Sequence, residues 1–245
     1  MEKIISQLKL VREMLKKTPN DAVPVPPALP ATKEAREVHK NIVADMFSDV
    51  KKHMDAGQHD ETQAAIGKLK NFAVTAPKGS IDIGHFGKLS DPLLTKDGHH
   101  MIDTTDIINH HLGDAKSLKD IYLNHGGEDT IKHLMRSMGA NGETAQYSNF
   151  HFKKPGLHED LLDMVNPGKA ALDRENNRHL GVLPSKYMGN TEPLDHLDQE
   201  VTKAHNGFFD TIFKGEDPTH EQEEALTNAV VARGIDTFKR HHGLT

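Results

Sequence analysis

The clearest helical pattern of the chain lies in Thr32-Lys-Glu-Ala-Arg-Glu-Val-His-Lys-Asn-Ile-Val-Ala-Asp-Met-Phe-Ser-Asp-Val-Lys-Lys-His-Met-Asp-Ala-Gly57. Apolar side chains recur in it every four residues, which places them along one face of an α-helix. Thr32 is a suitable N-cap for this helix, and Gly57 is a suitable C-terminal stop. The predicted inward face consists of Val38, Ile42, Met46, Val50 and Met54.

A second helix is predicted directly after this one, with Asp60 as its N-cap and Phe72 at its end. The connection between the two helices, residues 57–59, is short enough to join antiparallel neighbours. We therefore expect residues 32–72 to form a helical hairpin. Its apolar side should pack against long helices near the C-terminus of the chain.

Two long helices are predicted in that C-terminal part. The first begins near Thr191, which can act as its N-cap, and ends at Gly215. The second begins at Thr219, where Gln222 stands three residues further on and completes a capping box. Both contain apolar residues at helical spacing, so we expect each to bury one face. In the first helix the residues at this spacing are Leu194, Leu197, Val201, His205, Phe208 and Ile212.

Between the hairpin and these helices, the pattern is interrupted by glycine and proline. From residue 75 to residue 101 no helical spacing persists, and Ile81 with Ile83 predicts one brief strand. The sequence therefore predicts a mainly α fold, an irregular multi-helix domain with long loops and at most one or two very short strands. Short helices are expected over residues 103–113, 117–126, 128–139, 157–165 and 169–179.

The chain divides by composition into three parts. Residues 1–17 predict an N-terminal amphipathic helix, which we call the arm. Residues 18–31 form a proline-rich linker, and prolines at this density favour an extended, stiff strut. Residues 32–245 are expected to form one helical body, whose irregular middle, residues 75–140, is rich in histidine. The apolar stripe of the arm consists of Ile4, Leu8, Val11 and Leu15.

The composition limits the classes of function. The 245 residues include 30 Lys and Arg against 36 Asp and Glu, so nucleic acid is disfavoured as a partner. The absence of cysteine excludes disulfides, thiol catalysis and thiolate metal sites. No apolar run approaches the ~18 residues that a membrane span requires. We expect a soluble protein without a recognisable secretion signal, located in the cytoplasm or assembled in a virion.

The stretch Gly84–His133 is the best place in the sequence for a chemical site, because seven histidines lie there among seven aspartates. Spacing of four puts a carboxylate and an imidazole on one helical face. Two such pairs facing each other would suit Zn, Mn or Fe(II). The imidazoles also predict that this region is sensitive to pH near ~6.5. The candidate metal ligands are Asp106, His110, Asp129 and His133.

Catalytic motifs are absent from the sequence. It contains no His-Glu-x-x-His, no phosphate-binding glycine loop and no Gly-x-Ser-x-Gly. The favoured hypothesis is a non-enzymatic interaction or assembly protein without a cofactor, for example a viral or phage virion component. Its arm and long loops would contact a protein partner or further copies of the chain. The alternative is a metal-dependent hydrolase that uses the central His and Asp residues. The predicted partner-binding side chains are Ile4, Leu8, Val11 and Leu15.

Overall fold

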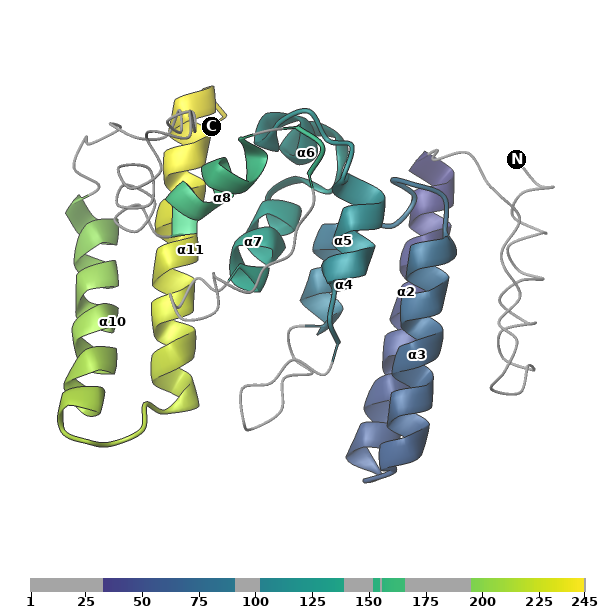
Figure 1. The fold of residues 1–245 in the computed structure, drawn as a ribbon, viewed down its shortest axis with the longest axis horizontal. Coiled ribbons are helices and arrows are strands. Elements are labelled where there is room, and N and C mark those ends of the chain that lie inside the picture. Colours follow the sequence, from purple (N-terminus) through teal and green to yellow (C-terminus); the bar gives the residue numbers. More distant parts are fainter. Residues whose placement is uncertain (1–32, 91–101, 139–151, 155, 166–194, 245) are drawn as a thin grey trace. The chain divides into compact units, whose positions relative to one another are not determined.

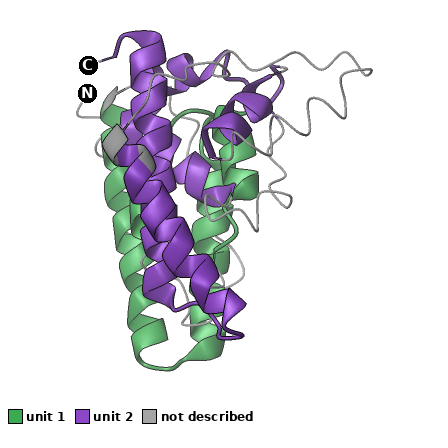
Figure 2. Ribbon diagram, turned by 90° about the vertical axis from the view of Figure 1, so that its left-hand side faces the viewer, with its two compact units in different colours: residues 1–113 green, residues 114–245 purple. Residues whose placement is uncertain are grey.

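The computed structural model describes residues 33–90, 102–138, 152–154, 156–165 and 195–244 (Figure 1). Within these ranges the chain forms nine helices and no strand, which confirms the predicted mainly α fold. The chain separates into two compact units, residues 1–113 and residues 114–245, which Figure 2 shows in two colours. The predicted arm and linker lie outside the described residues. No described helix is both long enough and apolar enough to cross a membrane.

Unit 1 is built on the predicted helical hairpin. Helix α2 spans Lys33–Asp55, and helix α3 spans His59–Thr75 and packs along it. Helix α4 (Ile83–Ser90) packs on α2, and helix α5 (Thr105–Leu112) packs on α3. The side chains at the centre of this unit are almost fully buried. They include Ile42, Val43, Phe47, Val50, Leu69, Phe72, Phe86, Ile107 and Ile108.

The buried face of α2 is rotated from the predicted one. Ile42 and Val50 are buried as expected, whereas Val38 and Met46 are only half-buried. His39, which no apolar pattern would select, is 1% exposed and stacks edge-on against Phe72 with ring centres 5.6 Å apart. The face of α2 that contacts its neighbours therefore contains a polar side chain at a core position.

Two local predictions in unit 1 are wrong. Asp60 is not the cap of α3, because Gln58 occupies that position and Asp60 lies in the first turn. A carboxylate there is still favourable, since it faces the positive end of the helix dipole. The predicted strand at Ile81 and Ile83 is also wrong, because α4 begins at Ile83. The Asp82 Oδ1 atom accepts the backbone N–H of His85 at 3.0 Å, which stabilises a helix start at this point.

Unit 2 is organised around helix α11, His220–His242. Helix α10 (Asp195–Phe213) packs along one side of α11, and helices α7 (Gly127–Ser137) and α8 (Leu157–Val165) pack on another (Figure 1). Helix α6 (Leu118–Asn124) packs against α7 and α8. The bounds of α8 are the predicted ones. Helix α11 is thus the central element of this unit.

Helix starts in unit 2 follow the sequence signals. The Ser117 side chain accepts the backbone N–H of Asp120 at the start of α6. Thr219 and Gln222 form the predicted capping box at the start of α11. Gly126 and Gly127 both have positive φ, which lets the chain turn sharply between α6 and α7.

Helices of unit 2 approach each other closely at Gly234 on α11. A Cβ atom placed there would lie 2.3 Å from Met135 Cε and 2.9 Å from the Met164 carbonyl oxygen. Gly234 therefore allows α7 and α8 to pack closely against α11. Its neighbours on the same face of α11 are Leu226, Val231, Ile235 and Phe238, all buried.

Candidate functional site

Three histidines of unit 1, His39, His110 and His111, bond the backbone of their own unit. His111 on α5 is buried, and its Nδ1 atom accepts the N–H of Gly79 at 3.0 Å. Its Nε2 atom lies 2.7 Å from the carbonyl oxygen of Ala73 and donates to it. An N–H can only donate and a carbonyl can only accept, so these two contacts require the neutral ring with its proton on Nε2. His110 Nε2 donates in the same way to the Ala76 carbonyl at 2.8 Å.

A third imidazole, that of His39 on α2, also bonds the backbone between residues 73 and 80. Its Nδ1 atom donates to the Ser80 carbonyl oxygen at 3.1 Å. Burial lowers the pKa of His39, although the hydrogen bond to Ser80 partly opposes this shift. The segment 73–80, which leads from the end of α3 toward α4, is therefore fixed by three imidazoles. These rings serve the fold of unit 1, because they hold backbone groups that would otherwise lack partners.

The four predicted metal ligands are divided between the units. Asp106 and His110 belong to α5 of unit 1, where Asp106 is exposed and His110 is bonded to Ala76. Asp129 and His133 belong to α7 of unit 2, where His133 is only 4% exposed. The described residues contain no group of three or more His, Asp or Glu side chains that could hold a metal ion. The metal-binding quartet and its Zn, Mn or Fe occupant stay a prediction.

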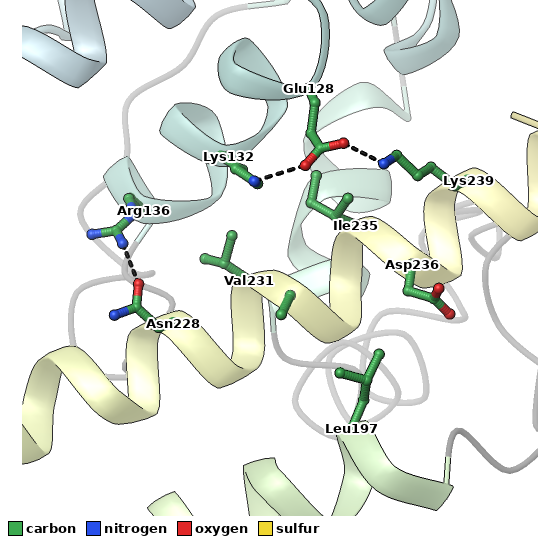
Figure 3. Close-up of a pocket in the computed structure, with 10 residues that line it drawn as sticks. Glu128, Lys132, Arg136, Leu197, Asn228, Val231, Ile235, Asp236 and Lys239 are labelled. Atoms are coloured by element: carbon green, nitrogen blue, oxygen red, sulfur yellow. Dashed lines mark hydrogen bonds and ion pairs between the residues drawn. The ribbon is translucent and has the colours of Figure 1, made fainter. Parts of the chain in front are cut away.

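Unit 2 contains a pocket of about 490 Å³ beside helices α7 and α11 (Figure 3). Figure 3 shows an apolar wall and a rim of charged side chains, with Leu197 approaching from the start of α10. The volume would accommodate a small molecule or one or two side chains of a partner. Its lining residues are Glu128, Lys132, Arg136, Leu197, Asn228, Val231, Ala232, Ile235, Asp236 and Lys239.

One carboxylate of this pocket, that of Glu128, is shared by two lysines. Glu128 binds Lys132 at 2.7 Å through one carboxylate oxygen and Lys239 through the other (Figure 3). Hydrogen bonds from these two lysines hold the pKa of Glu128 below its ordinary value. The bond to Glu128 in turn raises the pKa of Lys239. Both groups therefore stay charged at neutral pH, whereas a general acid or base needs a pKa near the working pH.

The most exposed apolar side chains of unit 2 include a group at the C-terminal end of α10. Phe213 is 83% exposed and Ile212 is 38% exposed, and Phe209 lies one turn before Phe213 with ring centres 6.4 Å apart. His205 continues the row, 4.3 Å from Phe209. We call Phe209, Ile212 and Phe213 the α10 aromatic end. Single exposed apolar residues are common, whereas here two stand next to each other in the sequence beside the half-buried Phe209.

The sequence did not predict this surface. Phe208 and Ile212 lie on the predicted apolar stripe of the late helix, and Phe208 is buried as expected, whereas Ile212 is 38% exposed. Phe209 and Phe213, four residues apart, form a second face that the single-stripe interpretation overlooked. The predicted partner-binding residues Ile4, Leu8, Val11 and Leu15 lie outside the described residues. No family model, curated protein or solved structure matches this chain.

Proposed function

We propose that this protein is a non-enzymatic assembly protein that associates with further copies of itself through the α10 aromatic end. The observation that carries the proposal is the exposure of Phe213, 83% of whose surface is open to solvent beside Ile212 and Phe209. An exposed aromatic side chain next to other apolar groups is the usual anchor of a protein–protein contact. Burying such a side chain contributes about 1.5–3 kcal/mol.

The chemistry of the remaining candidates supports a binding role over a catalytic one. In unit 1, His110 and His111 are already engaged by backbone groups. In unit 2, hydrogen bonds from Lys132 and Lys239 lower the pKa of Glu128, and the bond to Glu128 raises the pKa of Lys239. Neither arrangement supplies a side chain tuned for proton transfer. Assembly within a virion remains a prediction of the sequence that rests on general analogy.

The proposal is tested by sedimentation velocity of the full chain over a range of concentrations. Wild-type protein should associate as concentration rises. Phe213→Ser should weaken that association by about 10- to 100-fold, since each 1.4 kcal/mol of lost burial corresponds to a tenfold change in the dissociation constant. Melting temperature should hardly change, because the side chain is exposed in the single chain.

The matched control is Leu123→Ser on α6. Leu123 is also a large apolar residue of unit 2, 59% exposed, but it lies away from α10 in the sequence and in a different helix. Its replacement should leave association unchanged. A wild-type chain that stays monomeric at all concentrations, or equal effects of both replacements, would contradict the proposal.

A further inference from the structure

We propose that the α10 aromatic end is the receptor for the arm, residues 1–17, of a second copy of this chain. This inference rests on the proposed function and names the two surfaces that meet. The contact between copies would be head-to-tail, because the arm and its receptor are different surfaces.

The receptor combines apolar and acidic side chains. Phe213 and Ile212 are exposed at the end of α10, and the turn from α10 to α11 follows directly. Between positions 210 and 223, five side chains are acidic and one is a lysine. Asp210, Glu216 and Asp217 are exposed and form no ion pair with another described residue. The acidic side chains are Asp210, Glu216, Asp217, Glu221 and Glu223.

The arm has the complementary composition. Five of its residues are Lys or Arg and two are Glu, so it carries a net charge of +3 (5 − 2). Its predicted helix places apolar residues in one stripe, which can cover Phe213 while the basic residues approach the acidic turn. Opposite charges at the rim of an apolar contact speed encounter and fix its register. The basic residues are Lys3, Lys9, Arg12, Lys16 and Lys17.

A second copy is the occupant that the linker favours. Prolines 24, 26, 27 and 30 fall within seven residues, and such a segment favours an extended strut of ~3.1 Å per residue. A stiff spacer projects an amphipathic helix outward at a low entropic cost, which suits capture by another molecule. Because the arm and its receptor are different surfaces, the contact is heterologous and can continue from copy to copy. That is the geometry of an assembling protein.

The chain contains no cysteine, so thiols introduced singly report one contact at a time. One batch of full chain carries Gln7→Cys beside the apolar stripe of the arm, and a second carries Lys214→Cys at an exposed position next to Phe213. Both variants keep Leu8 and Phe213, and the two batches are mixed under oxidising conditions. A docked pair holds its thiols at millimolar local concentration, so at micromolar protein the mixed dimer should form on the order of 100-fold faster than random collision allows. The control mixture pairs Gln7→Cys with Leu123→Cys, which is exposed on α6.

Charge reversal gives a second, independent measurement. The pair Glu216→Lys and Asp217→Lys should slow formation of the mixed dimer by tenfold or more, on the order expected when complementary charges become like charges. Lys9→Glu with Arg12→Glu in the arm should slow it equally. Combining the two sets should restore most of the rate. Restoration cannot result from misfolding, so it separates a contact from a damaged surface.

Three results would overturn the inference. The first is a mixed dimer that forms no faster with Lys214→Cys than with Leu123→Cys. The second is a chain carrying both Gln7→Cys and Lys214→Cys that closes on itself at a rate independent of dilution, which would place the arm on its own body. The third is a lack of rescue on charge reversal. If any of these occurs while Phe213→Ser still weakens association in sedimentation, the proposed function stands and only the identity of the occupant is wrong.

Discussion

Units 1 and 2 differ in where their most distinctive side chains lie: those of unit 1 are buried, and that of unit 2 is exposed. In unit 1 the imidazoles of His39 and His111 turn inward and bond the backbone of residues 73–80. In unit 2 the phenyl ring of Phe213 turns outward at the end of α10. The histidines that stand out in the sequence thus include three that stabilise the fold of unit 1. The most exposed aromatic side chain described in unit 2, Phe213, belongs to the surface that we propose for assembly.

The two units also differ in how their interiors are stabilised. Both units contain buried polar side chains, but in unit 1 those of His39 and His111 bond the backbone of residues 73–80. Such groups stabilise a fold only while their hydrogen bonds are complete. In unit 2 a close helix contact depends on Gly234, where α11 meets Met135 of α7 and the backbone of α8. Loss of these hydrogen bonds should therefore damage unit 1, and volume added at Gly234 should damage unit 2.

The largest effect should come from His111→Phe in unit 1. The replacement keeps a ring of similar shape but leaves the Gly79 N–H and the Ala73 carbonyl without their partner. Each buried group left unpaired costs about 1–3 kcal/mol, so unit 1 should lose about 2–6 kcal/mol of stability. Hydrogen exchange of the α3 amides measures this loss.

The neighbouring replacement His110→Phe is the matched control. His110 is half-buried and makes one bond, to the Ala76 carbonyl, which water can replace. The expected loss is only about 0.5–1.5 kcal/mol. Equal losses for the two replacements would mean that burial of His111 does not decide the stability of segment 73–80.

The next effect should come from Gly234→Ala in unit 2. The added methyl group would meet Met135 Cε and the Met164 carbonyl oxygen, so α8 or α11 must shift. Overpacking of this kind costs about 1–3 kcal/mol. All three tyrosines lie after residue 113. Urea unfolding of unit 2 can therefore be followed by tyrosine fluorescence.

For Gly234→Ala the control is Gly207→Ala on α10. A Cβ atom at Gly207 meets nothing within 4 Å. Alanine is the better helix former, so this replacement should stabilise unit 2 by up to about 1 kcal/mol. If Gly234→Ala also stabilises unit 2, then α11 does not need a glycine at position 234 to pack against α7 and α8.

The smallest effect concerns pH and His39. Burial lowers the pKa of His39 below its ordinary value of 6.5. Between the folded and unfolded pKa values the unfolded chain binds a proton that the folded chain does not, so stability falls as pH drops below about 6.5. The slope from this one group is at most about 1.4 kcal/mol per pH unit.

Hydrogen exchange of the α2 amides between neutral and mildly acidic pH, corrected for the intrinsic rate, measures the effect of His39. His39→Asn keeps a donor near the Ser80 carbonyl but cannot titrate, so it should flatten the pH dependence. An unchanged slope in this variant would show that His39 is not the group responsible.

Much of the fold was predictable because it rests on local signals. The hairpin of α2 and α3, the bounds of α8 and the capping box at Thr219 all follow from spacing and caps within a few residues. The start of α4 was missed because it depends on the Asp82 side chain capping the His85 N–H, a choice that two nearby isoleucines do not reveal. His39 was missed because its burial depends on Ser80, 41 residues away.

The candidate surface was harder to predict than the fold. Periodicity identifies side chains that a helix buries, here Phe208. It does not predict whether a second apolar face, here Phe209 and Phe213, is buried or exposed. Phe213 is exposed because α10 packs along α11, a pairing that the sequence alone does not specify. The histidine-rich stretch attracted attention by its composition, yet its burial depends on long-range contacts with the backbone at the end of α3.

The central claim is that association buries the α10 aromatic end and leaves the histidine-held region of unit 1 unchanged. Hydrogen exchange of the wild-type chain at low and high concentration tests it directly. Protection should rise with concentration at the amides of Ile212 and Phe213 and in the following turn, while the α5 amides around His111 should exchange equally at both. Protection that rises around His111 instead, or that rises nowhere in unit 2, would contradict the account.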